Sequence, residues 1–526
     1  MKRILSFAIV MAILVASVLT VPVAYAEENN GTSSVSVWDG TIPTANSSYT
    51  YGGGTGTAQD PYLLKTAYDV AMLAANVNNG ENYSWDKTFK LCVDLDMNNQ
   101  AWPGIGNAQT RDNPVRTFKG AFDGDGHVVY NLNLSSEPVT ESSTGTIGRG
   151  FFGATFDATI KNFGIASGTI ELTNNRSVGA IVGRAWRTLT MENCFSGADM
   201  VLSYEIDKPA SSDTNVVFED EDAWYAGGLI GSANQNTNGT ALTNCFWFGS
   251  IEAKVSKDMP IAIGGIVGMV LNNNLTLNSV TSVGSITIDS VGTQAHRVSS
   301  LLGWARTPWS VAAGGENSYN SIAFVNCKAG GNVSFVGSNV NTARVSALSG
   351  WNWHLKWTVE NTVYNYNCGN DAVTQIVGNF GSVSATSTTD EIKITSSALF
   401  TNYAYQNGKA ATEGEYKIRF ASELAVSPYA FAKAGYIVTV SYNDNGTTKT
   451  ADIELSGKVV YTSLRTPSGD VTPKTGKCFV AQGITDIPLE SATFTITPFV
   501  ETADGVRIYG TTTEPTELPL VPEVVA

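Results

Sequence analysis

A short apolar motif bounded by glycines recurs through the middle of the chain. Four copies are complete and two lack the first glycine; they lie at 150–153, 179–183, 227–231, 264–268, 300–303 and 347–350. An asparagine that ends or interrupts an apolar strand follows each copy: Asn162, Asn193, Asn244, Asn278, Asn326 and Asn361. The glycine-to-asparagine offsets are 9, 10, 13, 10, 23 and 11 residues, so only the fifth copy carries a large insertion.

Repeats of this length, built from short strands, are typical of solenoids and propellers. The chain lacks the four-strand signature of a propeller blade, so the pattern predicts a parallel β-helix with one coil per repeat. Inward side chains of each coil would then stack on those of the coil before. We expect glycine and asparagine at the corners because both tolerate the left-handed backbone conformation.

The segment 61–80 predicts a helix that caps the first coil. Thr66 is a suitable N-cap and Gly80 a suitable stop. A solenoid end exposes unpaired strand edges and core side chains, so a terminal cap is expected. The apolar face of this helix would be formed by Val70, Leu73, Ala74 and Val77.

Beyond the repeats, a Ser/Thr-rich stretch is followed by longer alternating strands at 416–420, 435–442, 458–464 and 493–500. Turn-forming residues separate these strands, which favours a small β-sandwich. The whole chain is therefore predicted to be all-β. Its predicted segments are a signal peptide at 1–26, an N-terminal extension at 27–60, the β-helix at 61–380, a linker at 381–395, the sandwich at 396–510 and a flexible tail at 511–526.

The first 26 residues have the pattern of a secretory signal. Lys2 and Arg3 precede an apolar run, and Ala24-Tyr25-Ala26 fits a cleavage site. An uncleaved membrane anchor is the alternative interpretation. No later apolar stretch approaches the length of about 20 residues that a membrane helix needs. We therefore expect a secreted, extracellular protein, either free or associated with a cell surface, with no membrane segment in the mature chain.

Composition and charge narrow the possible partners. Apolar residues make up 43% of the chain and charged residues only 15%, which disfavours coiled-coil and disordered proteins. Removal of Lys2 and Arg3 with the signal changes the formal net charge from −15 to −17. Nucleic acids and anionic membranes require basic surfaces, so neither is expected as a partner. A glycan or a host or cell-surface protein remains compatible with this charge.

One position in the repeat, directly after the asparagine, accepts several residue types. Its occupants are Phe163, Cys194, Cys245, Ser279, Cys327 and Thr362. A metal ligand or disulfide partner would not be exchanged so freely, so we expect the three thiols to be buried and unpaired. A disulfide between neighbouring coils, or a zinc site, remains an alternative. No cofactor and no metal site is predicted.

The order of several motifs resembles a known group of proteins. The motifs are DLDMNN, WPGIG and FKGAFDGDGH, followed by the glycine-bounded repeats with Asn-Cys. Over about 61–370 the chain resembles bacterial secreted or cell-surface proteins with GLUG-type repeats. This resemblance implies a right-handed parallel β-helix in adhesion-related or carbohydrate-associated proteins, and no single activity. The motifs GYIVTVSY and TPFVETADG resemble a C-terminal module of secreted Firmicutes proteins.

Two pairs of carboxylates are candidate sites of chemistry: Asp94 with Asp96, and Asp123 with Asp125. Such pairs could hydrolyse a glycosidic bond, bind calcium, or form hydrogen-bonded turns at solenoid corners. The turn role is the expected one, and no catalytic residue is assigned. Arginines that could assist a lyase show no distinguishing pattern: Arg184, Arg187, Arg306 and Arg344.

Tryptophans follow the repeat glycine in three copies, which would bring them to one corner of stacked coils. Exposed aromatic rows can stack on sugar rings, whereas buried ones would shield the last coils. The candidate ligand-binding residues are Trp186, Trp304, Trp309, Trp351, Trp353 and Trp357. We expect a non-enzymatic surface scaffold or adhesin that binds glycans through this side. The alternative is a carbohydrate-active enzyme, a polysaccharide lyase or glycoside hydrolase, on a β-helix.

Overall fold

The computed structural model describes most of the chain between residues 35 and 517. The residues outside this description are 1–34, 108–113, 136–147, 207–223, 337–340, 379–382, 397–399, 410–415, 425–430, several short stretches between 458 and 491, and 518–526. The predicted signal peptide therefore lies outside the described residues.

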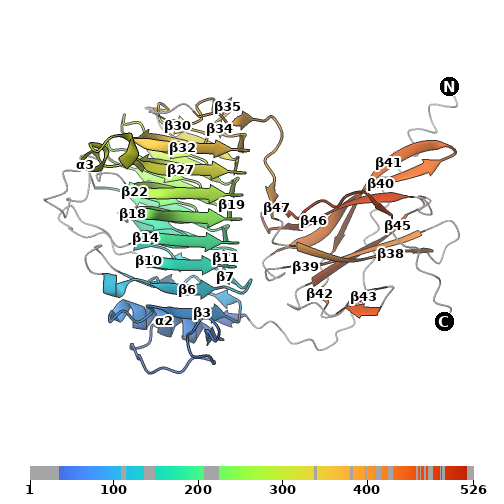
Figure 1. The fold of residues 1–526 in the computed structure, drawn as a ribbon, viewed down its shortest axis with the longest axis horizontal. Helices are drawn as coiled ribbons and strands as arrows, with labels where there is room; N and C mark the ends of the chain where they lie inside the picture. The colour runs from blue at the N-terminus through green and yellow to red at the C-terminus, as the bar shows by residue number, and fades with distance from the viewer. Residues whose placement is uncertain are drawn as a thin grey trace. The chain divides into compact units, whose positions relative to one another are not determined.

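The repeats form a parallel β-helix, as the sequence predicts (Figure 1). Four stacked sheets make up its walls, and six full coils each contribute to every sheet; the last two coils contribute two strands each to the long-strand sheet. Within a coil the chain passes through a short entry sheet, a long-strand sheet, a corner sheet and a return sheet. Neighbouring coils pair in parallel, and the chain reverses only between the last two strands of the return sheet.

The entry sheet contains β9 (Gly148–Arg149), β13 (Ser177–Gly179), β17 (Trp224–Gly227), β21 (Ile261–Gly264), β25 (Arg297–Ser299) and β30 (Val345–Ser346). The long-strand sheet contains β2 (Tyr62–Leu64), β3 (Lys87–Leu91), β6 (Gly120–Asp123), β10 (Phe152–Lys161), β14 (Val182–Glu192), β18 (Ile230–Thr243), β22 (Val267–Asn278), β26 (Leu302–Arg306), β27 (Asn320–Val325), β31 (Ser349–Trp353) and β32 (Leu355–Glu360).

The corner sheet contains β1 (Ser36–Val37), β4 (Leu95–Asp96), β7 (Val128–Tyr130), β11 (Gly164–Ile165), β15 (Phe195–Ser196), β19 (Phe246–Trp247), β23 (Thr281–Ser282), β28 (Lys328–Ala329), β33 (Val363–Tyr364) and β36 (Thr386–Ser387). The return sheet contains β12 (Thr169–Thr173), β16 (Asp199–Tyr204), β20 (Ser250–Val255), β24 (Ser285–Ser290), β29 (Asn332–Val336), β34 (Asn367–Cys368) and β35 (Asp371–Ala372).

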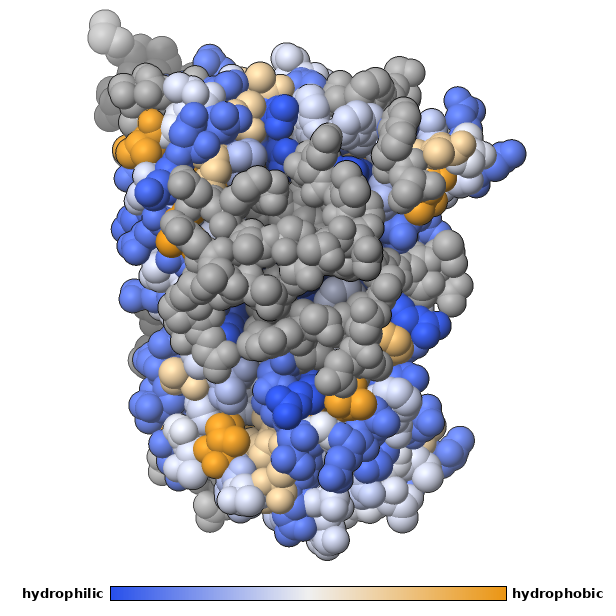
Figure 2. Space-filling view, turned by 90° about the vertical axis from the view of Figure 1, so that its left-hand side faces the viewer, coloured by the Kyte–Doolittle hydropathy of each residue, from blue (hydrophilic) through white to orange (hydrophobic). Residues whose placement is uncertain are grey.

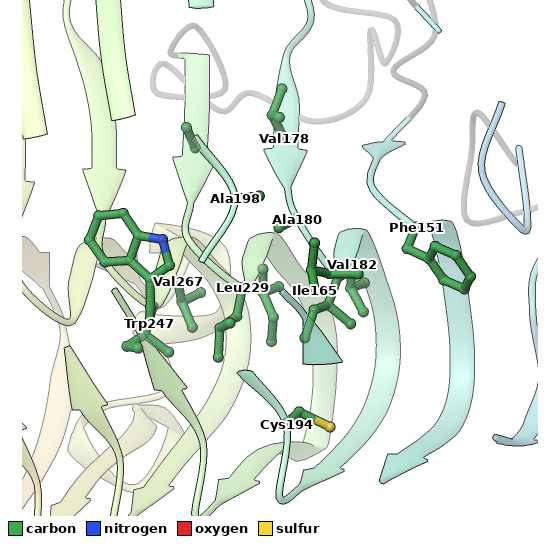
Figure 3. Close-up of a cluster of buried hydrophobic side chains, with 14 of the residues drawn as sticks. Phe151, Ile165, Val178, Ala180, Val182, Cys194, Ala198, Leu229, Trp247 and Val267 are labelled. Atoms are coloured by element: carbon green, nitrogen blue, oxygen red, sulfur yellow. The ribbon is translucent and has the colours of Figure 1, made fainter. Parts of the chain in front are cut away.

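Apolar side chains from equivalent positions stack inside the coils. The apolar residue before the long strand is fully buried in every coil, and Figure 3 shows this interior. This column consists of Phe151, Ile181, Leu229, Ile266, Leu301 and Leu348. Burial of such a column along the whole solenoid supplies the apolar contacts that a single coil could not make alone.

The last glycine of each motif, such as Gly231 or Gly303, serves a different purpose from the one expected. None of these glycines has a positive φ, so left-handed backbone is not the reason for their presence. A Cβ at Gly231 would lie 2.5 Å from the carbonyl oxygen of Gly183 and 2.6 Å from the backbone nitrogen of Val178. A Cβ at Gly303 would meet the Gly268 carbonyl oxygen at 2.6 Å. Glycine is needed because adjacent backbone approaches too closely for any side chain.

The corner asparagines do adopt the left-handed conformation, with φ near +50°, as expected. Their amides also bond from coil to coil: Asn193 Nδ2 donates to Asn162 Oδ1 at 3.0 Å, and Asn244 Nδ2 donates to Asn193 Oδ1 at 3.4 Å. In the fourth coil the corner residue is Ser279, with φ 55°, and not Asn278, which ends β22. The predicted register of that coil was therefore wrong by one residue.

The buried position after the corner holds the three thiols. Cys194, Cys245 and Cys327 are buried and free, and the inward residue of the fourth coil is Val280 rather than Ser279. Each thiol donates to the carbonyl oxygen two residues earlier, at 3.3–3.4 Å, and the Thr362 hydroxyl makes the same bond. This shared bond explains why one position accepts both cysteine and threonine. Figure 3 shows Cys194 in this interior position.

Helix α2 (Ala67–Asn79) covers the first coil (Figure 1). Thr66 is its N-cap and forms a capping box with Asp69, and Gly80 ends it. The predicted helix thus begins six residues later than expected, because 62–64 form β2 and pair with β3. The solenoid also begins earlier than its predicted boundary at 61, since β1 pairs with β4. A two-stranded pair, β5 (Ala101–Trp102) and β8 (Asn133–Leu134), and the short η1 (Pro114–Arg116) complete this end.

The insertion predicted in the fifth repeat separates β26 from β27. It contains α3 (Trp309–Ala312) and the short η2 (Glu316–Ser318). At the far end, residues 373–378 pack Val373 and Val377 against the solenoid core. β36, within the predicted linker, extends the corner sheet by pairing with β33.

The C-terminal part forms two further sheets, as predicted for a sandwich. One contains β37 (Ile394–Thr395), β40 (Lys433–Asp444), β41 (Thr447–Gly457), β46 (Thr493–Glu501), β47 (Arg507–Tyr509) and β48 (Thr516–Glu517). The other contains β38 (Phe400–Lys409), β39 (Tyr416–Leu424), β42 (Val460–Tyr461) and β45 (Cys478–Thr485), and β43 (Leu464–Thr466) pairs separately with β44 (Gly469–Val471). Both sheets contribute to one apolar core that includes Phe420, Tyr436 and Ile496.

Candidate functional site

Two outward columns run across the first half of the long strands. Between them lies an inward column of small residues that belongs to the solenoid core. The first outward column consists of Arg184, Ser232, Met269, Trp304 and Trp351. The second consists of Trp186, Asn234, Leu271, Arg306 and Trp353. The register therefore brings Trp304 directly beside Trp351, and Trp353 into the column that Trp186 begins.

An arginine accompanies four of the six candidate tryptophans. The guanidinium carbon of Arg344 lies 3.9 Å from the ring centroid of Trp351, and that of Arg297 lies 4.3 Å from Trp304. The corresponding distance is 4.4 Å for Arg184 and Trp186, and 5.6 Å for Arg306 and Trp353. Cation–π contacts of this kind hold a ring and a guanidinium in fixed mutual orientation.

The six tryptophans differ in exposure. Trp186 is 5% exposed and Trp304 is 1% exposed, so neither offers a ring face to a ligand in this structure. Trp304 instead packs with Tyr225 and Met269 in a small apolar cluster outside the solenoid core. Trp351 and Trp353 are half-buried. Trp309 begins α3 in the insertion, and its side chain lies outside the described part.

Trp357 points to the other side of the sheet from Trp351. The expectation that 351, 353 and 357 share one face assumes an unbroken strand. His354 has a φ of 53° and separates β31 from β32, so the alternation of faces resets at this residue. Trp357 therefore packs against the solenoid core, with its ring 5.9 Å from Phe324.

Burial shifts the pKa values of the charged groups at this corner. Arg297 is 7% exposed, and its burial, with Arg344 nearby, lowers the pKa of its guanidinium to about 10. The pKa of Arg344 is also lowered by burial. Burial and the neighbouring Arg306 lower the pKa of His354 below its usual value. The lowered pKa of His354 favours the neutral imidazole, whose ring stacks 5.6 Å from that of Trp353.

The exposed end of the corner thus combines aromatic rings with polar groups. Trp351 and Trp353 are accompanied by the neutral His354 ring, which also lies 5.2 Å from Tyr319. Half-exposed rings can cover an apolar ligand face, while guanidinium and imidazole nitrogens can bond to hydroxyl groups. This combination suits a ligand that has both apolar and hydroxylated faces.

The carboxylates weighed for catalysis have contacts typical of turn residues. Asp96 accepts from the Asn98 backbone amide at 2.8 Å, and Asp123 accepts from the Asp125 amide at 3.0 Å. Both are Asx turns. Each carboxylate also accepts a hydrogen bond of 2.9 Å from the side-chain amide of an asparagine, Asn131 for Asp96 and Asn162 for Asp123. Asp94 is buried and accepts from the His127 ring at 2.9 Å.

Sequence reasoning considered Arg184, Arg306 and Arg344 only as residues that could assist a lyase, and it missed Arg297 and the pairing of arginines with tryptophans. Arg297 and Arg344 come from the entry sheet and the residue before it, seven residues ahead of the tryptophans that they contact. Only the fold of the corner brings them over the rings. The regular spacing of an arginine seven residues before a tryptophan, at 297 and 304 and again at 344 and 351, was the signal present in the sequence.

On the side drawn in Figure 2, the described surface is mostly hydrophilic, and apolar residues form small separate groups. Within the described ranges, no three His, Cys, Asp or Glu side chains gather as a metal site would require. Among the helices that the structure describes, none has the length and apolar character of a membrane crossing.

No family model matches the chain, so the resemblance to GLUG-type repeat proteins stays a hypothesis. No curated protein matches it either. A solved structure titled "IgA1 Protease" is similar over 59% of this chain, at 17% identity and a TM-score of 0.34. The chain spans about a fifth of the length of that protein, since the match covers 20% of it.

Proposed function

We propose that this chain is a secreted, surface-associated β-helical scaffold that binds glycans without chemical turnover. We use the term tryptophan corner for the two outward columns that contain Trp186, Trp304, Trp351 and Trp353. The binding edge would be the exposed end of this tryptophan corner, on the last full coil. This role agrees with the resemblance of its repeats to GLUG-type proteins, which are found in adhesion-related and carbohydrate-associated settings.

The observation that supports the proposal is the pair of half-buried rings, Trp351 and Trp353, on β31. They alternate on one strand, so their Cα atoms are about 6.7 Å apart along it. Arg344 contacts the first ring and Arg306 the second. A ring backed by a guanidinium loses little conformational freedom on binding, which favours affinity. Two rings so placed would engage neighbouring sugar units of one chain.

The test is a glycan array with the purified full-length mature chain, followed by affinity measurement on the strongest hits. The Trp351→Ala/Trp353→Ala double variant should lose binding at least tenfold, whereas single Trp→Phe variants should retain most of it. Tyr68→Ala is the matched control, since Tyr68 is a 51% exposed aromatic residue on α2 at the other end of the solenoid.

Stability must be measured alongside, because both tryptophans are half-buried. Replacing a fully buried tryptophan by alanine lowers the free energy of unfolding by about 3–5 kcal/mol, so we expect about half that loss for each of these half-buried rings. Binding is therefore compared at a temperature where all variants are folded by circular dichroism. Unchanged binding by the double variant would reject the edge. Cleavage of a bound glycan by the unmodified chain would instead support the carbohydrate-active enzyme alternative.

A further inference from the structure

The N-terminal cap contains a cavity that the tryptophan corner does not include. It lies at the C-terminal end of α2, between the loop 80–87 and the segment 45–47. Its volume is about 460 Å³. Small-molecule sites occupy roughly 300–1,000 Å³, so this space suits one or two sugar units.

The walls of the cavity are held by hydrogen bonds. Asn76, on α2, donates to the backbone carbonyl of Asn46 at 3.0 Å and accepts from its backbone amide at 2.6 Å. The hydroxyls of Tyr83 and Tyr51 are 3.1 Å apart. The Ser84 hydroxyl accepts from the Lys119 backbone amide at 3.0 Å and so ties the loop to the next coil. A ligand would therefore meet a preorganised surface.

The loop has an unusual backbone conformation. Glu81, Asn82 and Asp86 all have left-handed φ values, of 62°, 56° and 57°. Non-glycine residues rarely adopt this region, and clusters of them occur where the surrounding structure imposes a shape for binding. Here the conformation turns the chain sharply after Gly80 and brings Tyr83 and Trp85 into the lining.

The lining combines three kinds of chemistry. Tyr83 and Trp85 supply aromatic surface, and each has a lysine ammonium over its ring, Lys87 at 3.8 Å and Lys119 at 3.9 Å. Asn79 and Asn82 supply amides, and Asn82 Oδ1 is a buried acceptor with no partner in the structure. Glu81 and Lys87 line the same space with opposite formal charges. A ligand rich in hydroxyl groups and without net charge matches this set.

We propose that this cavity is a second binding site, for a neutral sugar unit, independent of the tryptophan corner. Asn79, Asn82 and Glu81 would bond to hydroxyl groups, and the aromatic rings would cover the apolar face of the sugar. The Lys87 ammonium lies over the Tyr83 ring and can donate to a further hydroxyl. A terminal unit of an oligosaccharide would fit a cavity of this size.

The test is saturation-transfer NMR on the full chain with methyl glucoside, methyl galactoside, methyl mannoside and N-acetylglucosamine, and with glucuronate as the charged comparison. At least one neutral sugar should show transfer from the protein. Asn79→Trp, which fills the mouth of the cavity from the last residue of α2, should weaken that binding at least tenfold, and Glu81→Gln should weaken it severalfold. Asp86→Asn is the matched control, because Asp86 lies in the same loop with the same backbone conformation but does not line the cavity.

The outcomes separate this site from the proposed edge. Binding that survives Trp351→Ala/Trp353→Ala but is lost in Asn79→Trp supports the cavity. Binding that is lost only in the double tryptophan variant overturns the cavity and leaves the edge. Absence of transfer from every neutral sugar, or equal transfer from glucuronate, also overturns the proposal.

Discussion

Replacement of Gly231 by alanine tests whether the repeat glycines are required for close packing. The added Cβ would lie 2.5 Å from the Gly183 carbonyl oxygen and 2.6 Å from the Val178 nitrogen. Both are backbone atoms of the neighbouring coil, so no side-chain rotation can relieve the contact. Overpacking of this kind costs about 1–3 kcal/mol, and the alanine recovers about 0.4–1 kcal/mol by restricting the unfolded chain. We expect a net loss of about 1.4 kcal/mol.

Hydrogen exchange read by mass spectrometry measures this loss locally. A loss of about 1.4 kcal/mol corresponds to roughly tenfold faster exchange, and it should appear in peptides from β14 and β18. Gly446→Ala is the contrasting variant: its φ is 84° and nothing lies within 4 Å of the added Cβ. It should cost about 1 kcal/mol through backbone conformation, and only in β40 and β41. Exchange of β14 and β18 within twofold of the unmodified chain would refute the packing explanation.

Three further outcomes follow from burial. Trp304→Ala should lower stability by about 3–5 kcal/mol, because the ring is 1% exposed; an unchanged melting temperature would contradict this. Burial raises the pKa of Cys327 from 9.0 to about 11, so stability should fall as pH rises between these values, where only the unfolded thiol ionises; Cys327→Thr should make that fall shallower, and an unchanged slope would contradict the assignment. Burial lowers the pKa of His296 from 6.5 to about 4, so stability should fall as pH decreases across that interval, by up to about 1.4 kcal/mol per pH unit; an equally steep fall in His296→Gln would contradict the assignment.

The sequence pattern was sufficient to predict the solenoid because apolar residues at the same place in successive repeats form its inward columns. Leu229 and Ile266 occupy the same place in their repeats, and both are fully buried. The capping helix was predictable from the Thr66 and Gly80 signals at its ends. The predicted position of the fourth corner was wrong because Ser279 adopts the left-handed conformation that asparagine adopts at the corners of other coils.

The candidate site was less predictable because it depends on register between distant segments. Trp357 faces the core because the backbone at His354 is left-handed. A histidine in the sequence does not predict that conformation. Arg344 covers Trp351 only because the chain turns sharply between the entry sheet and the long strands. The cavity at the cap arises from three left-handed residues whose types, Glu81, Asn82 and Asp86, are ordinary for any polar loop.

The most direct test of glycan binding at the tryptophan corner is fluorine NMR of the full chain labelled with 5-fluorotryptophan. Resonances would be assigned by single Trp→Phe variants, and the chain titrated with the strongest oligosaccharide from the array. We expect the Trp351 and Trp353 signals to shift with saturation, while the signals of Trp304, which is 1% exposed, and of Trp357, which packs against the solenoid core on the other side of the sheet, stay in place. Unmoved signals from Trp351 and Trp353 at saturating oligosaccharide would contradict it.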